Sequence, residues 1–240
     1  MIFNSCKKDI QGCKDPIACN YGSATVSNNM NTIIEDDCEY AALGYDCDGM
    51  LVEYVIGMEI AGGFLFFVDS KGENGLLAAK EDIGTFEWGC EDIVIETDSL
   101  IGSGYQNTHA IINHPCQTVD GGITAAQAAF DYEYTEYTEH YSGWYLPSID
   151  ELLEMQKAIG HQFDYDSTDG THHETSNIGL FRVAYYWSSS SHKYNGTTTS
   201  LNATAARFDI DYTATGGLKR YKWWVRPIRS IELGPSPKYH

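Results

Sequence analysis

The sequence has few basic residues. Its 240 residues contain 15 lysines and arginines against 34 aspartates and glutamates, which gives a formal net charge of −19. Nucleic-acid binding needs a basic patch that displaces counterions from phosphates. Docking on anionic lipid also needs a positively charged surface. The composition therefore argues against both kinds of partner.

Long apolar runs are missing as well. No stretch of about 18 apolar residues occurs, so the sequence offers no segment that would span a bilayer. Hydrophobic residues nevertheless make up 42% of the chain and aromatic residues 13%. A chain of this composition can bury a sizeable core, which argues against wholesale disorder.

Cysteine is absent after position 116. Four of the seven cysteines crowd into residues 13–47, a density typical of a small disulfide-stapled module. Zinc is the alternative, but zinc ribbons need close C-x2-C pairs, and the spacings here are five, eighteen and eight intervening residues. We expect disulfides, and hence an oxidising compartment. The six cysteines expected to form them are Cys13, Cys19, Cys38, Cys47, Cys90 and Cys116.

The pairing among the first four of these cysteines stays open. A bridge between Cys90 and Cys116 would stabilise the fold by about 3 kcal/mol, because it closes a loop in the unfolded chain.

Cys6 is left over. It follows an apolar start and Ser5 and precedes Lys7 and Lys8, an arrangement that resembles the lipobox of bacterial lipoproteins, especially those of Bacteroidetes. The resemblance implies a lipid on Cys6, which would be the only membrane contact. A signal peptide needs about 15–30 residues, more than precede Cys6, so its start would lie upstream or have been trimmed. A free cysteine in a frayed tail is the alternative.

Residues 7–50 lack a sustained hydrophobic period and are rich in Asn, Asp, Gly and Cys, which indicates loops and turns held by bridges. The ordered strings GCKDPIACNY, EDDCEY and GYDCDG strongly resemble a Cys-rich module of surface and secreted proteins of marine Bacteroidetes. The resemblance covers about forty residues and implies an extracellular setting, without an activity.

Two helices are expected in residues 51–232. The Ala-rich segment 124–130 predicts one, with Thr124 as its N-cap. Residues 148–160 predict the other, because Ser148 and Glu151 form a capping box and Gly160 ends the segment.

Strands are expected on both sides of these helices. An apolar run over 61–69, turn residues over 69–75 and a second run over 76–79 predict a hairpin with a central strand. The chain is β-rich from about residue 180, and Pro227 within the closing strand 223–231 indicates an edge or a bulge.

Three strings of the second unit, SGWYLPSIDEL, YWSSS and WVRPIR in that order, resemble the DUF1566 or Lcl-type C-terminal domain. Residues 102–108 also resemble that family's G-x-G-x-x-N-T turn. The resemblance spans about 175 residues. It implies an α+β, C-type-lectin-like fold, in which a twisted antiparallel sheet carries two helices. Family members are mostly surface adhesins and binding modules, and some are diversified by retroelements.

A long polar segment, residues 192–212, is expected to form an adaptable binding loop, because it is rich in Tyr, Ser, Gly and Asn. A solvated loop without a role is the alternative. Trp187, Trp223 and Trp224 are expected mainly as sheet anchors, with one of the adjacent pair exposed. The candidate ligand-binding residues are His192, Tyr194, Asn195, Thr197, Asn202, Asp209, Tyr212 and Trp223.

Catalytic and metal chemistry finds weaker support. Asp164, Asp166 and Asp169 make a weak calcium candidate, because hard oxygen ligands alternate there but the EF-hand spacing fails. The string His172-His173-Glu174 lacks the H-E-x-x-H spacing of a zinc site and is expected in a solvated loop. The serines near residue 190 do not form a G-x-S-x-G elbow. We expect no enzyme and no cofactor, with calcium as a weak possibility.

The expected organisation is a residual lipobox in residues 1–6, a Cys-rich module in 7–50, a C-type-lectin-like domain in 51–232 and a tail in 233–240. The expected function is a lipid-anchored binding module on the outer membrane's extracellular face, or a secreted one, that recognises a protein or a glycan. A structural or accessory subunit of an outer-membrane or extracellular assembly is the alternative.

Overall fold

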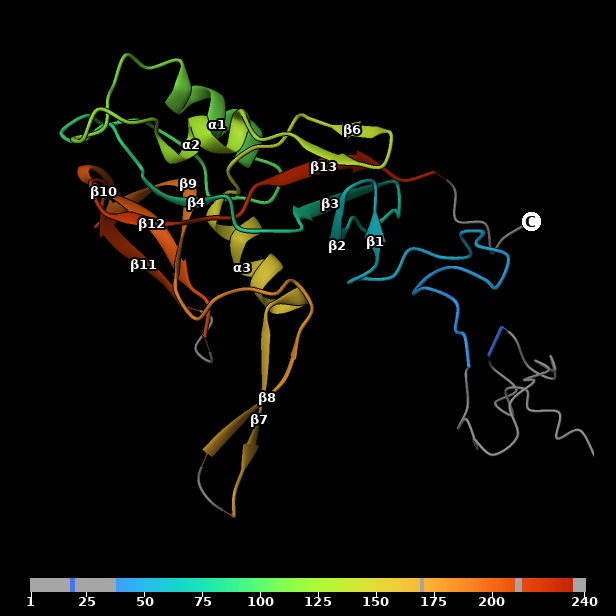
Figure 1. The fold of residues 1–240 in the computed structure, drawn as a ribbon. Coiled ribbons are helices and arrows are strands. Elements are labelled where there is room, and N and C mark those ends of the chain that lie inside the picture. Colours follow the sequence, from blue (N-terminus) through green and yellow to red (C-terminus); the bar gives the residue numbers. More distant parts are fainter. Residues whose placement is uncertain (1–17, 20–37, 169–170, 210–212, 235–240) are drawn as a thin grey trace, which may run out of the picture. The chain divides into compact units, whose positions relative to one another are not determined.

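The computed structural model describes residues 18–19, 38–168, 171–209 and 213–234 (Figure 1). The chain divides into two compact units, Met1–Val55 with Ser236–His240, and Ile56–Pro235. The described part is mixed α and β, with mostly antiparallel sheets and few helices. The expected α+β class is therefore confirmed at this level.

The first unit contains a disulfide between Cys19 and Cys47, which are 28 residues apart. Cys38 is also disulfide-bonded. A disulfide in the N-terminal region is therefore confirmed. The expectations for Cys6 and Cys13 fall outside the described residues.

Three helices are described in the second unit: α1 (Gly104–Ile112), α2 (Ala125–Phe130) and α3 (Ile149–Ile159). None of the described helices is both long enough and apolar enough to cross a membrane. The strands up to α3 are β1 (Glu59–Ile60), β2 (Gly63–Val68), β3 (Asn74–Ala79), β4 (Gly84–Glu87), β5 (Tyr134–Glu136) and β6 (Glu139–Tyr141). The later strands are β7 (His161–Asp166), β8 (Thr171–Asn177), β9 (Tyr185–Tyr194), β10 (Thr197–Arg207), β11 (Thr213–Leu218), β12 (Lys222–Val225) and β13 (Ile228–Glu232).

Two sheets form the body of this unit (Figure 1). One has the order β1-β2-β3-β13 and is antiparallel. The other has the order β11-β10-β9-β12-β4 and is antiparallel except between β9 and β12. The pairs β5–β6 and β7–β8 are separate hairpins, and β7–β8 extends away from the body.

The expected opening hairpin is present. Strand β2 pairs antiparallel with β3 and has β1 on its other side, so it is central in its sheet, as its continuous apolar sequence predicts. Asp69 forms the turn, because its carboxylate accepts hydrogen bonds from the backbone N–H groups of Lys71 and Glu73 and from the Asn74 amide.

The expected helix at 148–160 is confirmed as α3. Ser148 Oγ accepts from Glu151 N, and Glu151 Oε2 accepts from Ser148 N at 2.6 Å, which completes the capping box. The other oxygen, Oε1, accepts from Gly102 N at 2.9 Å. Glu151 is buried, and this burial raises the pKa of its carboxyl. The inner face of α3 is fully buried through Leu152, Met155 and Ile159.

The G-x-G-x-x-N-T string, expected as a turn, opens helix α1 instead. Gly104 is its first residue, and a Cβ there would overlap the Glu151 carboxylate. Asn107 is hydrogen-bonded to the backbone of the preceding loop, and Thr108 exchanges two hydrogen bonds with the backbone of Leu146. Tertiary hydrogen bonds hold this helix, so local propensity does not reveal it. Helix α2 begins after Thr124, whose side chain caps it as expected.

The expected single closing strand is also corrected. Residues 222–232 form two strands, β12 and β13, which belong to different sheets and are separated by Arg226 and Pro227. Proline has no N–H for a ladder and does not continue β12.

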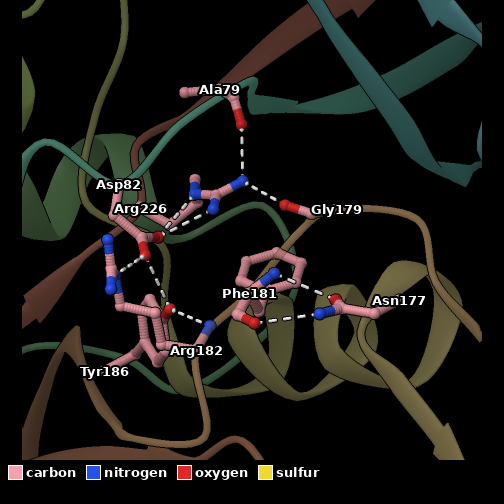
Figure 2. Close-up of polar contacts among 8 residues, drawn as sticks. All are labelled: Ala79, Asp82, Asn177, Gly179, Phe181, Arg182, Tyr186 and Arg226. Atoms are coloured by element: carbon pink, nitrogen blue, oxygen red, sulfur yellow. Dashed lines mark hydrogen bonds and ion pairs between the residues drawn. The ribbon is translucent and has the colours of Figure 1, made fainter. Parts of the chain in front are cut away.

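Arg226 is almost completely buried at this break and is fully used (Figure 2). Its Nε and Nη2 each lie 2.8 Å from Asp82 Oδ1, and its Nη1 donates to Ala79 O at 2.9 Å and Gly179 O at 2.8 Å. Tyr186 Oη donates to the second oxygen of Asp82 at 2.9 Å. This set, the Arg226 cluster, ties the segment after β3 to the segment after β8 and to β9.

A second fixed point is the disulfide between Cys90 and Cys116, which is present as expected. Lys219 Nζ donates to Ile93 O at 2.7 Å and to Cys90 O at 3.3 Å, and it lies 4.6 Å from the centre of the Trp88 ring. Burial lowers the pKa of Lys219 to about 8. The loop after β4 is therefore held both covalently and by a buried ammonium group.

Candidate binding face at the β9–β10 hairpin

The segment expected as a long binding loop is for the most part a β-hairpin. Strand β9 runs to Tyr194, strand β10 begins at Thr197, and these two residues pair directly. Asn195 and Gly196 form the turn with φ values of 50° and 79°. Two positive φ values are the mark of a type I′ turn, which Asn-Gly favours. The loop interpretation was wrong because it passed over this turn signal.

Four buried serines, Ser188 to Ser191, fix the base of the hairpin. Their hydroxyls form hydrogen bonds with three different segments, at Thr204 O of β10, the Asn107 amide of α1, and Asp98 O and Ile95 O of the loop before α1. Ser190 Oγ also accepts from Ile149 N, the first residue of α3. The serine run therefore holds β9 against β10, α1, α3 and the loop before α1.

A small pocket of about 270 Å³ lies beside this base. Its lining includes Thr97, Ser99, Ser190, His192, Thr204 and Thr215. The His192 ring lies across Gly216, where a Cβ would come within 2.8 Å of it. Such a pocket offers hydroxyl groups, one imidazole and the Lys193 ammonium group, which suit a ligand group that accepts hydrogen bonds and can also donate them.

The predicted residues nearest this pocket form one group at the hairpin end. His192 lines the pocket, and Tyr194 is 69% exposed at the last position of β9. Asn195 lies in the turn, and Thr197 opposes Tyr194. Because an Asn-Gly type I′ turn is short and has a defined conformation, it fixes the backbone position of Tyr194.

Trp223 lies elsewhere and is engaged in packing. Its ring centre is 4.3 Å from that of Trp187, 4.7 Å from Tyr185 and 5.7 Å from Tyr221. Gly217 leaves room for this ring, because a Cβ there would overlap it. Trp187 is fully buried, whereas Trp223 and Trp224 are both half-buried, so neither of the adjacent pair is fully exposed.

Two further predicted residues, Asn202 and Asp209, do not join the hairpin end. Asn202 lies within the irregular stretch of β10 between Thr198 and Ala203 and pairs with Leu218 of β11. Asp209 is buried and forms an ion pair with Arg207 at 2.8 Å. Tyr212 falls outside the described residues. Of the seven predicted residues that the structure describes, it therefore brings four together, His192, Tyr194, Asn195 and Thr197.

The sequence analysis did not predict that the loop containing Glu96 and Thr97 contacts the β9–β10 hairpin. Thr198 Oγ1 donates to Glu96 Oε2 at 2.8 Å, and Thr97 Oγ1 accepts from Ser191 N at 2.6 Å. These residues lie about a hundred positions upstream of the hairpin, in a stretch without periodicity, so no local signal identifies them.

The weak calcium candidate is placed differently from expectation. Asp164 and Asp166 belong to strand β7, and Asp166 Oδ1 accepts hydrogen bonds from the backbone and hydroxyl of Thr168. Asp169 falls outside the described residues. Among the residues that the structure describes, no group of three or more His, Cys, Asp and Glu side chains could hold a metal ion.

The histidine string was expected in a solvated loop and lies instead on strand β8. His172 and His173 pair with Tyr165 and Asp164 of β7. Upstream, the buried His161 Nδ1 lies 3.0 Å from Glu174 Oε2, which links the two strands near the start of the hairpin.

Comparison with known proteins adds no assignment, because no family model matches the chain and no curated protein shows significant similarity to it.

Proposed function

We propose that this chain is a cell-surface binding module that recognises a protein or a glycan through the β9–β10 hairpin end and carries out no catalysis. The observation that supports it best is Tyr194, an exposed aromatic side chain at the end of a hairpin whose base is fixed by four buried hydroxyls. Rigid aromatic anchors beside adaptable hydroxyl groups are typical of recognition surfaces.

The proposal includes the C-type-lectin-like fold of DUF1566 or Lcl-type domains. In support, the resemblance strings all perform scaffold roles in this chain. Ser148 and Glu151 start α3, the serine run anchors β9, and Arg226 joins three segments. Strand β13 returns to pair with β3 of the opening hairpin, as expected of a domain whose ends lie together.

We further propose that the chain is held outside the cytoplasm, through a lipid on Cys6 at the outer membrane or as a secreted protein. The disulfides support this location, because such bonds persist in oxidising compartments. The negative net charge is consistent with a protein that binds neither nucleic acid nor an anionic bilayer.

The test probes a glycan array and an array of extracellular proteins with the wild type, Tyr194→Ala and His192→Ala. Tyr194→Ala is expected to weaken binding about tenfold or more, because truncating a central aromatic anchor removes buried contact area. The melting temperature should stay unchanged, because Tyr194 is exposed.

Tyr137→Ala is the matched control, since Tyr137 lies at the end of another hairpin, β5–β6, and is 98% exposed. It should bind as the wild type does. If all three variants bind equally well, the proposed face is wrong.

An accessory subunit of an outer-membrane or extracellular assembly is the second candidate. The β7–β8 hairpin favours it, because this two-stranded arm extends from the body (Figure 1), and isolated two-stranded hairpins are marginally stable in water. Such an arm gains stability when it docks on a partner. Co-purification in one stoichiometric complex would favour this candidate over a ligand-binding receptor.

A further inference from the structure

The loop before α1 presents apolar side chains from a rigid backbone. Leu100 is 59% exposed and Ile101 is 41% exposed. Leu100 O nevertheless accepts hydrogen bonds from Ser148 Oγ at 2.9 Å and from Ser103 Oγ at 2.6 Å. Because the backbone is held in this way, both side chains point outward without the freedom of an ordinary loop.

The same loop is held to α3 at two further points. Asp150 N donates to Ser99 O at 3.0 Å, and Gly102 N donates to Glu151 Oε1 at 2.9 Å. The two exposed side chains therefore keep a fixed position relative to the outer face of the helix, which lowers the entropy lost when a partner binds.

Together with this helix face they form a groove of about 790 Å³. We call it the α3 groove, lined by Leu100, Ile101, Asp150, Leu153, Glu154 and Lys157. Its volume falls within the range that holds several side chains of a bound segment.

Acidic side chains outnumber basic ones in the lining of the α3 groove. Asp150 and Glu154 line it, and the single lining cation, Lys157, lies 3.9 Å from Glu154. Burial, and after it the nearby charge of Asp98, raises the pKa of Asp150. A cation brought by a partner would therefore be attracted to this rim.

We propose that the α3 groove docks a segment of a partner protein that carries neighbouring apolar side chains followed by lysine or arginine. A second copy of this chain is a poor occupant, since two chains of net charge −19 repel each other. This surface has a lining different from that of the hairpin pocket, so the proposal goes beyond the ligand recognition described above.

The test uses three synthetic 14-residue peptides: an amphipathic Leu/Lys peptide, a Ser/Lys peptide of the same charge, and a Leu/Glu peptide. Binding is measured by fluorescence anisotropy at two salt concentrations. The Leu/Lys peptide is expected to bind about tenfold or more tightly than either other peptide, because the α3 groove requires both apolar contact and a cation.

Two variants locate the contact. Leu100→Ser with Ile101→Ser should reduce Leu/Lys affinity about tenfold, and Glu154→Gln should reduce it about threefold and weaken its salt dependence. Val119→Ser, which changes an equally exposed apolar residue on another loop, should have no effect. On the wild type, NMR shifts caused by the peptide should concentrate at residues 100–101 and 150–157, a readout that needs no variant.

Three results would overturn the proposal. The first is equal binding of the Leu/Lys and Ser/Lys peptides, which would mean unspecific attraction to an acidic protein. The second is the absence of binding or of shifts at the α3 groove. The third is adsorption to phosphatidylcholine vesicles that depends on Leu100 and Ile101, which would indicate a membrane contact. Tyr194→Ala should leave peptide binding intact, so failure here is distinct from failure of the proposed ligand site.

Discussion

At the scale of single residues, the buried Arg226 has the clearest energetic role. It offers its donors to one carboxylate and two backbone carbonyls, and its guanidinium centre lies 4.2 Å from the middle of the Phe181 ring. Planar, forked donors suit this site in a way that a lysine ammonium does not. The side chain therefore fixes the segment between β12 and β13, directly before Pro227.

Arg226→Met should lower the free energy of unfolding by about 3 kcal/mol, because it removes the buried cation 2.8 Å from Asp82 and leaves this buried carboxylate only the exposed Arg182, 3.5 Å away. Arg226→Lys should be intermediate, since it keeps the charge but loses the forked contacts. Urea unfolding measures both changes.

Arg220→Met serves as the control, because Arg220 forms an exposed ion pair with Glu91. Its effect should be small, as surface ion pairs contribute little. A similar loss for Arg226→Met and Arg220→Met would contradict the role given to Arg226.

At the scale of elements, the sequence predicted what local rules determine. The capping box of Ser148 and Glu151 predicted α3, and the Asp69 turn between apolar runs predicted β2–β3. Helix α1 was missed because Asn107 and Thr108 are anchored by distant backbone. Pro227 indicated an edge or a bulge, but the division into two strands of different sheets was missed, because it depends on the long-range pairing of β13 with β3. Of the candidate site, His192 and Tyr194 were foreseen. The upstream loop at Glu96 and Thr97 was not, because only the tertiary fold brings it there.

Gly104→Ala tests the junction of two elements. Alanine normally stabilises a helix relative to glycine by about 1 kcal/mol. Here it should instead destabilise the protein by about 1–3 kcal/mol, because the added Cβ would overlap the Glu151 carboxylate that caps α3. Thermal and urea unfolding provide the measurement.

Gln106→Ala, at an exposed position of the same helix, should change stability little. A more stable Gly104→Ala protein would show that the carboxylate moves aside without loss.

At the scale of the whole molecule, the distribution of charge follows from how the cations are used. Lys219 and Arg226 are buried, and Arg182, Arg207, Arg220 and Lys222 form ion pairs with acidic side chains. The excess of carboxylates is therefore left to solvent. Such a surface keeps copies of the protein apart and attracts cationic partners in a salt-dependent way.

The disulfide between Cys90 and Cys116 also acts on the whole chain. Replacing both cysteines with alanine should lower the free energy of unfolding by about 3 kcal/mol, because the bond restricts a 26-residue loop in the unfolded state. Denaturant unfolding of the variant measures this loss. Mass spectrometry under non-reducing conditions should find the linked peptides in the wild type, and free thiols at both positions would contradict the bond.

The pairing of β13 with β3 has a consequence for how the protein folds. Ile228 pairs with Ala78, which lies 150 residues earlier (228 − 78). Contacts this distant in sequence slow folding, since a long loop must close before they form. Until β13 arrives, β3 keeps an unpaired edge and the first sheet is incomplete. We therefore expect β13 to join the first sheet late in folding, after the β2–β3 hairpin has formed.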